Sequence, residues 1–223
     1  MPTHDGGVTQ PANTSAPPFD RELLRRHMRG RRRVVSPTEQ AAAAQALVRV
    51  IARARLLRPG RRIAVYLPYR HEIDLNPVIA VARRRGCLLY APAIVDMKAR
   101  RMEFVAFVAG APRRRNRFGI LEPDHRTAPR LNVLQLDLIL LPLVAVDARG
   151  WRLGSGAGFY DRRLKHLRAH RRWRRPILVG VAYDFQRVPH IEPNPWDVPL
   201  DAVITERGFY RASRPAHPEP RSA

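Results

Sequence analysis

The chain is poor in cysteine and lysine and has no long apolar run. Its single cysteine, Cys87, excludes an intrachain disulfide and is typical of a reducing compartment. No stretch approaches the roughly 20 uninterrupted apolar residues of a membrane-spanning helix. The first 18 of the 223 residues contain no apolar segment of a secretory signal. We therefore expect a cytoplasmic protein that does not associate with a membrane.

Acidic residues are also scarce relative to basic ones. The chain has 41 lysines and arginines against 19 acidic residues, which gives a formal net charge of +22. Only two of these cations are lysines, Lys98 and Lys165. The arginine clusters are dispersed, and no aromatic residues alternate with them as base-stacking surfaces require. This pattern favours a solvated basic surface over a dedicated nucleic-acid surface, although its field would attract small polyanions.

The order of helix and strand signals predicts an α/β protein. Asp20 can cap a helix over 21–33, Ser36 begins a capping box for a helix that runs to about residue 58, and a third helix spans 76–86. Alternating helices and strands predict a largely parallel sheet covered on both faces. We expect one domain over 19–210, between a disordered tail at 1–18 and a flexible tail at 211–223. The expected strands are 63–68, 88–91, 102–107, 136–141, 177–182 and 201–205.

The most informative segment is 152–164, which reads RLGSGAGFYDRRL and follows an apolar run at 136–147. A glycine-rich turn that opens into a helix can bind phosphate oxygens through its backbone N–H groups, helped by the helix dipole. Arg152 adds a full charge, and Asp161 is a candidate metal ligand. The glycine spacing fits neither the dinucleotide fingerprint nor the P-loop. Spacing alone therefore leaves two possibilities open, a phosphate site and a turn in which glycines only supply positive φ.

Two further loops carry carboxylates. Glu72 and Asp74 follow the first expected strand, and ligands of parallel sheets gather at the carboxyl ends of strands. These two side chains could therefore receive N–H donors of a ligand. Asp197 lies in a rigid loop with Trp196 and two prolines, ahead of the last expected strand. Taken separately, both loops are better explained as turns with solvated carboxylates.

Together, the three segments resemble the 5-formyltetrahydrofolate cyclo-ligase family, also called methenyltetrahydrofolate synthetases. The resemblance rests on 72–74, the glycine turn and 196–200, which stand in the family's order after a basic helix and a Ser-capped helix. It implies a three-layer α/β/α fold similar to ribose-5-phosphate isomerase and the CoA transferases. It also implies ATP- and Mg²⁺-dependent conversion of 5-formyltetrahydrofolate to 5,10-methenyltetrahydrofolate, with release of ADP and phosphate, in folate and one-carbon metabolism.

The resemblance also implies residue roles. The formyl oxygen would attack the γ-phosphate of ATP, and N10 would then attack the activated carbon. Arg152, Tyr160 and Asp161 would be catalytic, and Asp161 and Asp197 would hold Mg²⁺. The implied contacts to the folate are Leu67, Glu72 and Tyr160. The implied ATP-binding residues are Arg21, Arg25, Arg152, Leu153, Gly154, Ser155, Gly156, Ala157, Gly158, Phe159 and Tyr160, of which Ser155, Ala157 and Phe159 depart from the common family pattern.

Two alternatives stay open. The chain could be a non-catalytic relative that binds RNA or polyphosphate through its arginine surface, or an ATP-dependent enzyme of the same fold with another acceptor. The pair Asp161 and Asp197 favours an enzyme, because a pure binding protein needs no metal-binding carboxylates. We expect a monomer whose partners are ATP and 5-formyltetrahydrofolate, free or polyglutamylated, and no specific nucleic acid.

Overall fold

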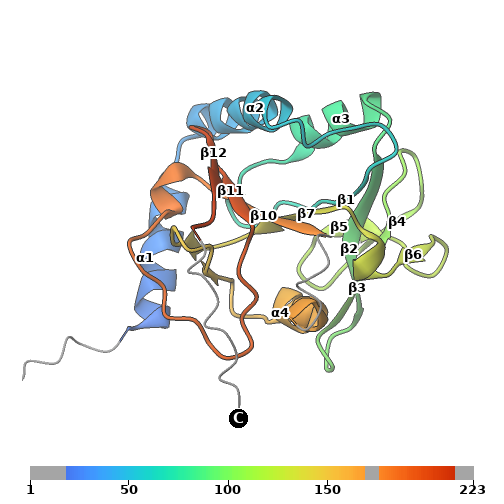
Figure 1. Cartoon of the computed structure of the whole chain (residues 1–223). Coiled ribbons are helices and arrows are strands. Elements are labelled where there is room, and N and C mark those ends of the chain that lie inside the picture. The colour runs from blue at the N-terminus through green and yellow to red at the C-terminus, as the bar shows by residue number, and fades with distance from the viewer. Residues whose placement is uncertain (1–18, 169–175, 214–223) are drawn as a thin grey trace, which may run out of the picture.

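An eight-stranded sheet forms the centre of the molecule (Figure 1). The computed structural model describes residues 19–168 and 176–213, so the predicted tail at 1–18, the end of the chain from 214 and the arginines of 171–175 lie outside the described residues. The strands of the sheet are β1 (Arg62–Ala64), β2 (Leu88–Asp96), β3 (Arg101–Ala106), β6 (Arg130–Leu131), β7 (Leu138–Pro142), β10 (Ile177–Val181), β11 (Ala202–Ile204) and β12 (Phe209–Arg211).

The sheet is parallel in its middle and antiparallel at its edges. Its strand order is β12-β11-β10-β7-β1-β2-β3-β6. The five strands from β11 to β2 are parallel, whereas β3 and β6 at one edge and β12 at the other are antiparallel additions. The predicted largely parallel sheet is therefore confirmed. Strand β7 lies at its centre, and its apolar sequence suits burial on both faces.

Helices cover both faces of the sheet. Helices α2 (Pro37–Arg53) and α3 (Asn76–Arg84) lie on one face and α4 (Phe159–Leu164) lies on the other, while α1 (Arg21–Arg33) stands beside the sheet (Figure 1). Both predicted caps form: Asp20 accepts from the N–H groups at the start of α1, and Ser36 and Glu39 make the capping box of α2. Helix α2 ends earlier than residue 58, because Arg55 takes a left-handed conformation (φ 53°).

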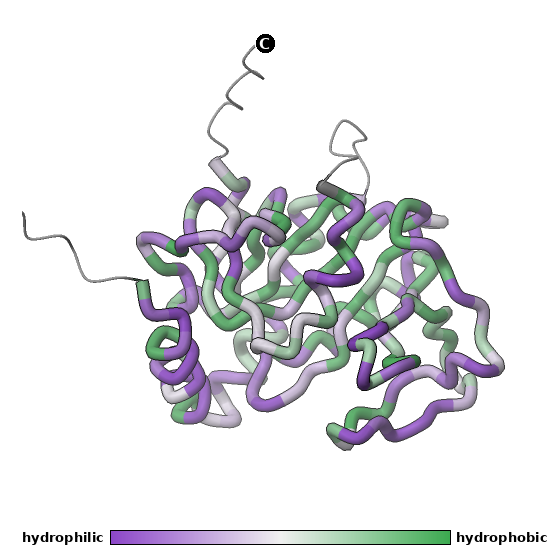
Figure 2. Tube along the Cα trace, turned by 90° about the horizontal axis from the view of Figure 1, so that it is seen from below, coloured by the Kyte–Doolittle hydropathy of each residue, from purple (hydrophilic) through white to green (hydrophobic). Residues whose placement is uncertain are grey.

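The strand residues alternate between two cores. Ile63 and Leu138 pack with α2 and α3, whereas the next residues, Ala64 and Ile139, pack on the opposite face with Leu164 of α4. The hydrophobic segments run through the middle of the molecule (Figure 2). None of the helices in the two described ranges combines the length and the apolar character that crossing a membrane requires.

Several short elements were not predicted. Two small hairpins, β4 (Arg113–Arg115) with β5 (Leu121–Pro123) and β8 (Ala145–Val146) with β9 (Arg152–Leu153), lie outside the main sheet. The apolar run at 136–147 is thus divided between β7 and β8, and the strand expected at 63–68 ends at Ala64. The predicted domain end at 210 falls inside β12, and the Ser213 N–H donates to the Ala148 carbonyl.

We expect Gly150→Ala to destabilise the protein. Gly150 has φ +84°, and an added Cβ would lie 2.6 Å from the Leu200 carbonyl oxygen. The left-handed strain and the backbone clash should together lower the free energy of unfolding by about 1–3 kcal/mol. Urea denaturation measures this change.

Gly30→Ala is the matched control. Gly30 lies inside α1 with open space around the position of a Cβ, so alanine should raise the free energy of unfolding by roughly 0.5–1 kcal/mol. Equal effects of the two substitutions would contradict the conformational difference between the sites.

Candidate active site

The glycine turn joins β9 to α4. Gly156 (φ +94°) and Gly158 (φ +74°) both take left-handed conformations, and Gly158 is the N-cap of α4. Ala157 lies outside the left-handed region, so its methyl group causes no backbone strain. The turn therefore needs glycine at 156 and 158, and alanine is compatible with the backbone at 157.

Two arginines of helix α1 bind carbonyl oxygens of this turn. The Arg25 Nε donates to the Gly154 carbonyl at 3.0 Å, and the Arg29 Nη2 donates to the Ser155 carbonyl at 2.8 Å. Arg25 also pairs with Glu22 on its own helix. Two arginines one helical turn apart thus fix the position of the turn, and they add positive charge beside it.

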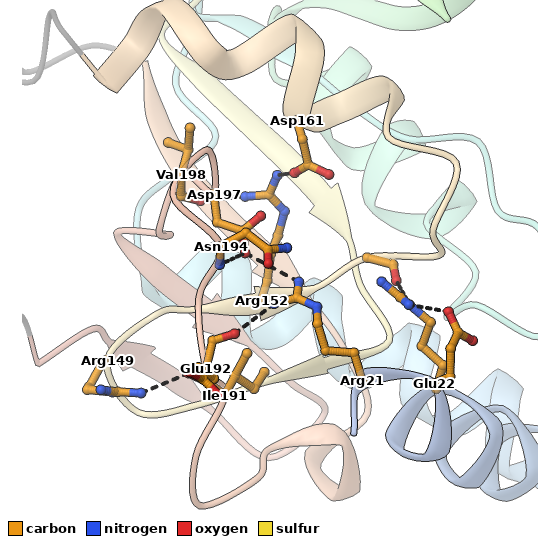
Figure 3. Close-up of polar contacts among 12 residues, drawn as sticks. Arg21, Glu22, Arg149, Arg152, Asp161, Ile191, Glu192, Asn194, Asp197 and Val198 are labelled. Atoms are coloured by element: carbon orange, nitrogen blue, oxygen red, sulfur yellow. Dashed lines mark hydrogen bonds and ion pairs between the residues drawn. The ribbon is translucent and has the colours of Figure 1, made fainter. Parts of the chain in front are cut away.

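Arg152 and Asp161 form an ion pair across the turn (Figure 3). Arg152 is only 5% exposed, and its Nη1 donates to the Val198 carbonyl. This bond connects the start of the glycine turn with the 194–200 loop. The structure therefore brings two of the three segments singled out in the sequence together at one guanidinium.

Asp197 is tied to the beginning of α1. Its buried carboxylate accepts from the Asn194 N–H at 2.8 Å and pairs with Arg21 at 3.3 Å. Arg21 also donates to the Glu192 carbonyl (Figure 3). Arg21 and Asp197 thus neutralise each other, and they connect the start of α1 with the loop that contains Glu192 and Asp197.

These carboxylates allow a test of whether the site suits Mg²⁺. Mg²⁺ in nucleotide sites takes one or two carboxylates, with phosphate oxygens and waters as the other ligands. Asp161 fits this role, since about a third of its side chain is exposed and its ion pair uses Oδ1. Asp197 fits less directly, because its Oδ2 already pairs with Arg21. No cluster of three or more His, Cys, Asp or Glu side chains able to hold a metal occurs in the described part of the chain.

A cavity of about 280 Å³ opens between the glycine turn and the loop that follows β1. Its other walls include Pro92 and Ile94 of β2 and Phe118 of the β4–β5 hairpin. Arg21, Arg25, Leu153 and Asp197 do not line it, and Leu153 is fully buried in a small core with α1. The expected site residues that line the cavity are Leu67, Glu72, Arg152, Gly154, Ser155, Gly156, Ala157, Gly158, Phe159, Tyr160 and Asp161.

Glu72 faces this cavity with a carboxyl that is largely, but not fully, buried. Its Oε2 accepts from the Tyr69 N–H at 3.2 Å, and its Oε1 lies 3.9 Å from the Arg32 guanidinium. Burial raises the pKa of Glu72 to about 7, against the opposing effects of Arg32 and of the Tyr69 N–H. Burial and the nearby Glu72 also raise the pKa of the Tyr160 hydroxyl, so Tyr160 is neutral and able to donate a hydrogen bond.

The structure changes one expectation and adds residues. Asp74 accepts from the N–H and the side-chain amide of Asn76, so it closes the turn into α3 and does not line the cavity. Arg29 and Arg32 do line it and were not singled out. Their spacing of four and seven residues from Arg25 places all three on one helix face, which is the signal that could have found them. The hairpin residues Phe118 and Glu122 carried no comparable signal.

Comparison with known proteins identifies the family of this chain. A model of the 5-formyltetrahydrofolate cyclo-ligase family matches residues 19–206. The chain belongs to this family. It is 34% identical over 179 residues to the 5-formyltetrahydrofolate cyclo-ligase of Escherichia coli K12, covering 80% of this chain and 96% of that one. The Haemophilus influenzae cyclo-ligase is 31% identical over 186 residues, with 82% and 96% covered.

A solved structure agrees with the family assignment. The NMR structure of Aquifex aeolicus 5,10-methenyltetrahydrofolate synthetase superposes with a TM-score of 0.74 at 27% identity, covering 90% of this chain and 97% of that chain. The family resemblance seen in the sequence is thus confirmed, and so is the mixed α/β fold. The residue roles that the resemblance implies remain predictions.

The burial of Glu72 predicts a pH-dependent effect on stability. The pKa of Glu72 lies near 7 in the folded protein and near 4.5 when unfolded, so the unfolded chain releases its proton first as the pH rises. Stability is therefore unaffected by this group below about pH 4.5, falls between pH 4.5 and 7, and stays lowered above that.

Glu72→Gln removes this titration. The unfolding free energy of the Gln variant, relative to the original protein, should therefore increase from pH 4.5 to pH 8. Thermal or urea unfolding of both proteins across this range measures the difference. A difference that does not change with pH would show that Glu72 titrates normally.

Proposed function

We propose that the protein converts 5-formyltetrahydrofolate to 5,10-methenyltetrahydrofolate at the expense of ATP, and that the cavity between the glycine turn and Glu72 is where this occurs. The observation that carries the proposal is the composition of this cavity. One wall offers backbone N–H groups and arginine charge suited to phosphates, and the other offers a largely buried carboxyl suited to N–H donors. Family membership supplies the identity of the two substrates.

The reaction needs phosphorylation because an amide oxygen is a poor leaving group. In the proposed path the formyl oxygen attacks the γ-phosphorus, the bond to the β–γ bridging oxygen breaks, and ADP leaves. N10 then attacks the activated formyl carbon and loses its proton. The carbon–oxygen bond breaks, and the former formyl oxygen departs with phosphate. The product keeps the carbon between N5 and N10.

The protein's part in such a phosphoryl transfer is positioning and charge stabilisation. Arg152 is buried beside the turn, so its charge acts in an environment of low dielectric. We assign it, with the turn's N–H groups, to the phosphates of ATP. Mg²⁺ held by Asp161 would neutralise phosphate charge, and Asp197 would join it after separating from Arg21. Arg21 and Arg25 would contact ATP from α1.

The folate would occupy the opposite side of the cavity. Leu67 is an apolar residue of this wall, and Glu72 would accept N–H donors of the pterin ring. Tyr160 lies between the two halves of the site, since it follows the glycine turn and interacts with Glu72. We therefore place Tyr160 where the formyl group meets the phosphate.

The first test of this function is Asp161→Asn. Loss of the carboxylate removes the proposed metal ligand and the ion-pair partner of Arg152, so kcat should fall by roughly 100-fold or more while the fold is retained. The assay follows the absorbance of 5,10-methenyltetrahydrofolate with ATP, Mg²⁺ and 5-formyltetrahydrofolate, and is repeated without each component. Circular dichroism checks the fold.

Glu103→Gln is the control for Asp161→Asn. Glu103 of β3 pairs at 2.8 Å with Arg163, which lies in α4 like Asp161, but Glu103 does not line the cavity. Its loss tests whether any broken ion pair to α4 reduces activity. Full activity of Asp161→Asn at limiting Mg²⁺ would overturn the assigned role.

The second test separates the folate from another acceptor. Glu72→Gln keeps the shape of the side chain but turns one acceptor into a donor. Facing the pterin's N–H groups, this mismatch should cost about 1–3 kcal/mol, seen as a loss of kcat/KM for 5-formyltetrahydrofolate. Binding of ATP with Mg²⁺, measured by calorimetry without folate, should barely change. Weakened nucleotide binding with normal folate kinetics would show that this loop does not contact the pterin.

A further inference from the structure

The loop that presents Glu72 has a strained backbone. Arg70 (φ 47°) and His71 (φ 61°) are consecutive non-glycine residues in the left-handed region. Such conformations cost free energy and persist only where surrounding contacts hold them. Within the loop, the Glu72 N–H donates to the Tyr69 carbonyl, and the Tyr69 N–H donates to the Glu72 carboxylate. These two local bonds close the turn, but they do not attach it to the rest of the protein.

Tyr69 lies against the Phe118 ring of the β4–β5 hairpin, and a polar attachment comes from Arg32 of α1. Arg32 is only 5% exposed, and its Nη2 donates to the Arg70 carbonyl at 3.1 Å, in the middle of the strained turn. Its Nη1 lies 3.5 Å from the Leu143 carbonyl and 3.9 Å from the Glu72 carboxylate. One planar guanidinium thus connects α1, the segment after β7 and the Glu72 loop, and its Nε has no hydrogen-bond partner among the residues that the structure describes.

Arg32 also determines the charge environment of Glu72. The hydroxyls of Tyr66, which donates to the Ile73 carbonyl, and of Tyr160 from α4 interact with this carboxylate. Both are neutral, because burial and Glu72 raise their pKa values. The other charged residues that line the same cavity are Arg29, Arg70, Arg152, Glu122 and Asp161. Arg32 supplies the positive charge that opposes the effect of burial on the Glu72 pKa.

We infer that Arg32 is a positioning residue for folate recognition, which holds the Glu72 loop in its strained conformation and stabilises the ionised form of the Glu72 carboxyl. This inference rests on the proposed function, in which an ionised Glu72 accepts the N–H donors of the substrate. It assigns two separable effects to one side chain: a charge that any cation could supply, and a two-point attachment that requires the guanidinium fork.

Two substitutions separate these effects. Arg32→Met keeps the length and apolar stem but removes the charge. The apparent pKa of the acidic limb of kcat/KM for 5-formyltetrahydrofolate should then rise by about one unit or more, with a loss of at least about 5-fold at pH 7 that is largely recovered near pH 9. Arg32→Lys keeps the charge, but a single ammonium group cannot reproduce the two bonds to the Arg70 and Leu143 carbonyls. It should leave the limb in place and raise KM several-fold at all pH values.

Arg33→Met is the matched control, since Arg33 is the adjacent residue of α1 and is exposed. Its pH profile and KM should equal those of the original protein. Binding of ATP with Mg²⁺ should be the same in all variants, and circular dichroism confirms that each folds. In the Glu72→Gln background, Arg32→Met should produce no further shift of the limb.

The outcomes distinguish this inference from the proposed function. If the original protein forms no 5,10-methenyltetrahydrofolate, the proposed function fails. If it does, and Arg32→Met leaves the acidic limb unmoved, the charge role of Arg32 is wrong. An acidic limb that shifts as far in Arg32→Lys as in Arg32→Met would also overturn the charge role. An unchanged KM in Arg32→Lys would overturn the role of Arg32 in holding the Glu72 loop.

Discussion

A small apolar contact holds helix α1 against the rest of the protein. Met28 packs with Val144, Ala145, Leu153 and Ile191 beside the β8–β9 hairpin. This contact places the same face of α1 against the glycine turn and the Glu72 loop. The helix is otherwise dominated by arginines, so its binding energy is shared between this apolar cluster and the bonds that its guanidinium groups make to backbone carbonyls.

The same arrangement accounts for the local charge balance. Four arginines, at 21, 25, 29 and 32, leave α1 toward the site, and their partners are mostly carbonyl oxygens, which neutralise no charge. Arg21, Arg25 and Arg32 also pair with Asp197, Glu22 and Glu72, respectively, whereas the partner of Arg29 is the Ser155 carbonyl. Arg29 therefore adds a positive charge beside the glycine turn. A polyphosphate that enters meets donors already fixed in position, so less ordering accompanies binding.

The sequence predicted the buried elements best. Strands β7 and β10 were expected close to their observed positions, because burial on both faces requires continuous apolar runs. The β4–β5 hairpin was missed since Arg113–Arg115 are exposed and carry no apolar pattern; pairing with β5 makes them a strand. The end of α2 was misplaced because an arginine, Arg55, adopts a left-handed conformation that its residue type does not suggest.

The site was predicted in separate parts. The glycine turn and Glu72 drew attention as local patterns, but residue types alone left a plain turn and a solvated carboxylate open, and their roles came from the family resemblance. That both face one cavity depends on the parallel pairing of β1 with β7 in the sheet. The role of Arg32 could not be read from the sequence, since its burial follows from tertiary packing and it stands among arginines that are exposed.

The position of α1 also has a consequence for synthesis. Arg25 is separated by 129 residues from the carbonyl it binds at Gly154. On the ribosome, α1 therefore leaves the exit tunnel long before the β8–β9 hairpin exists, and Ile191 follows later still. Long-range contacts of this kind form slowly and late. The nascent helix must remain undocked, with Met28 uncovered, so the cavity beside the glycine turn is completed only when nearly the whole domain has been translated.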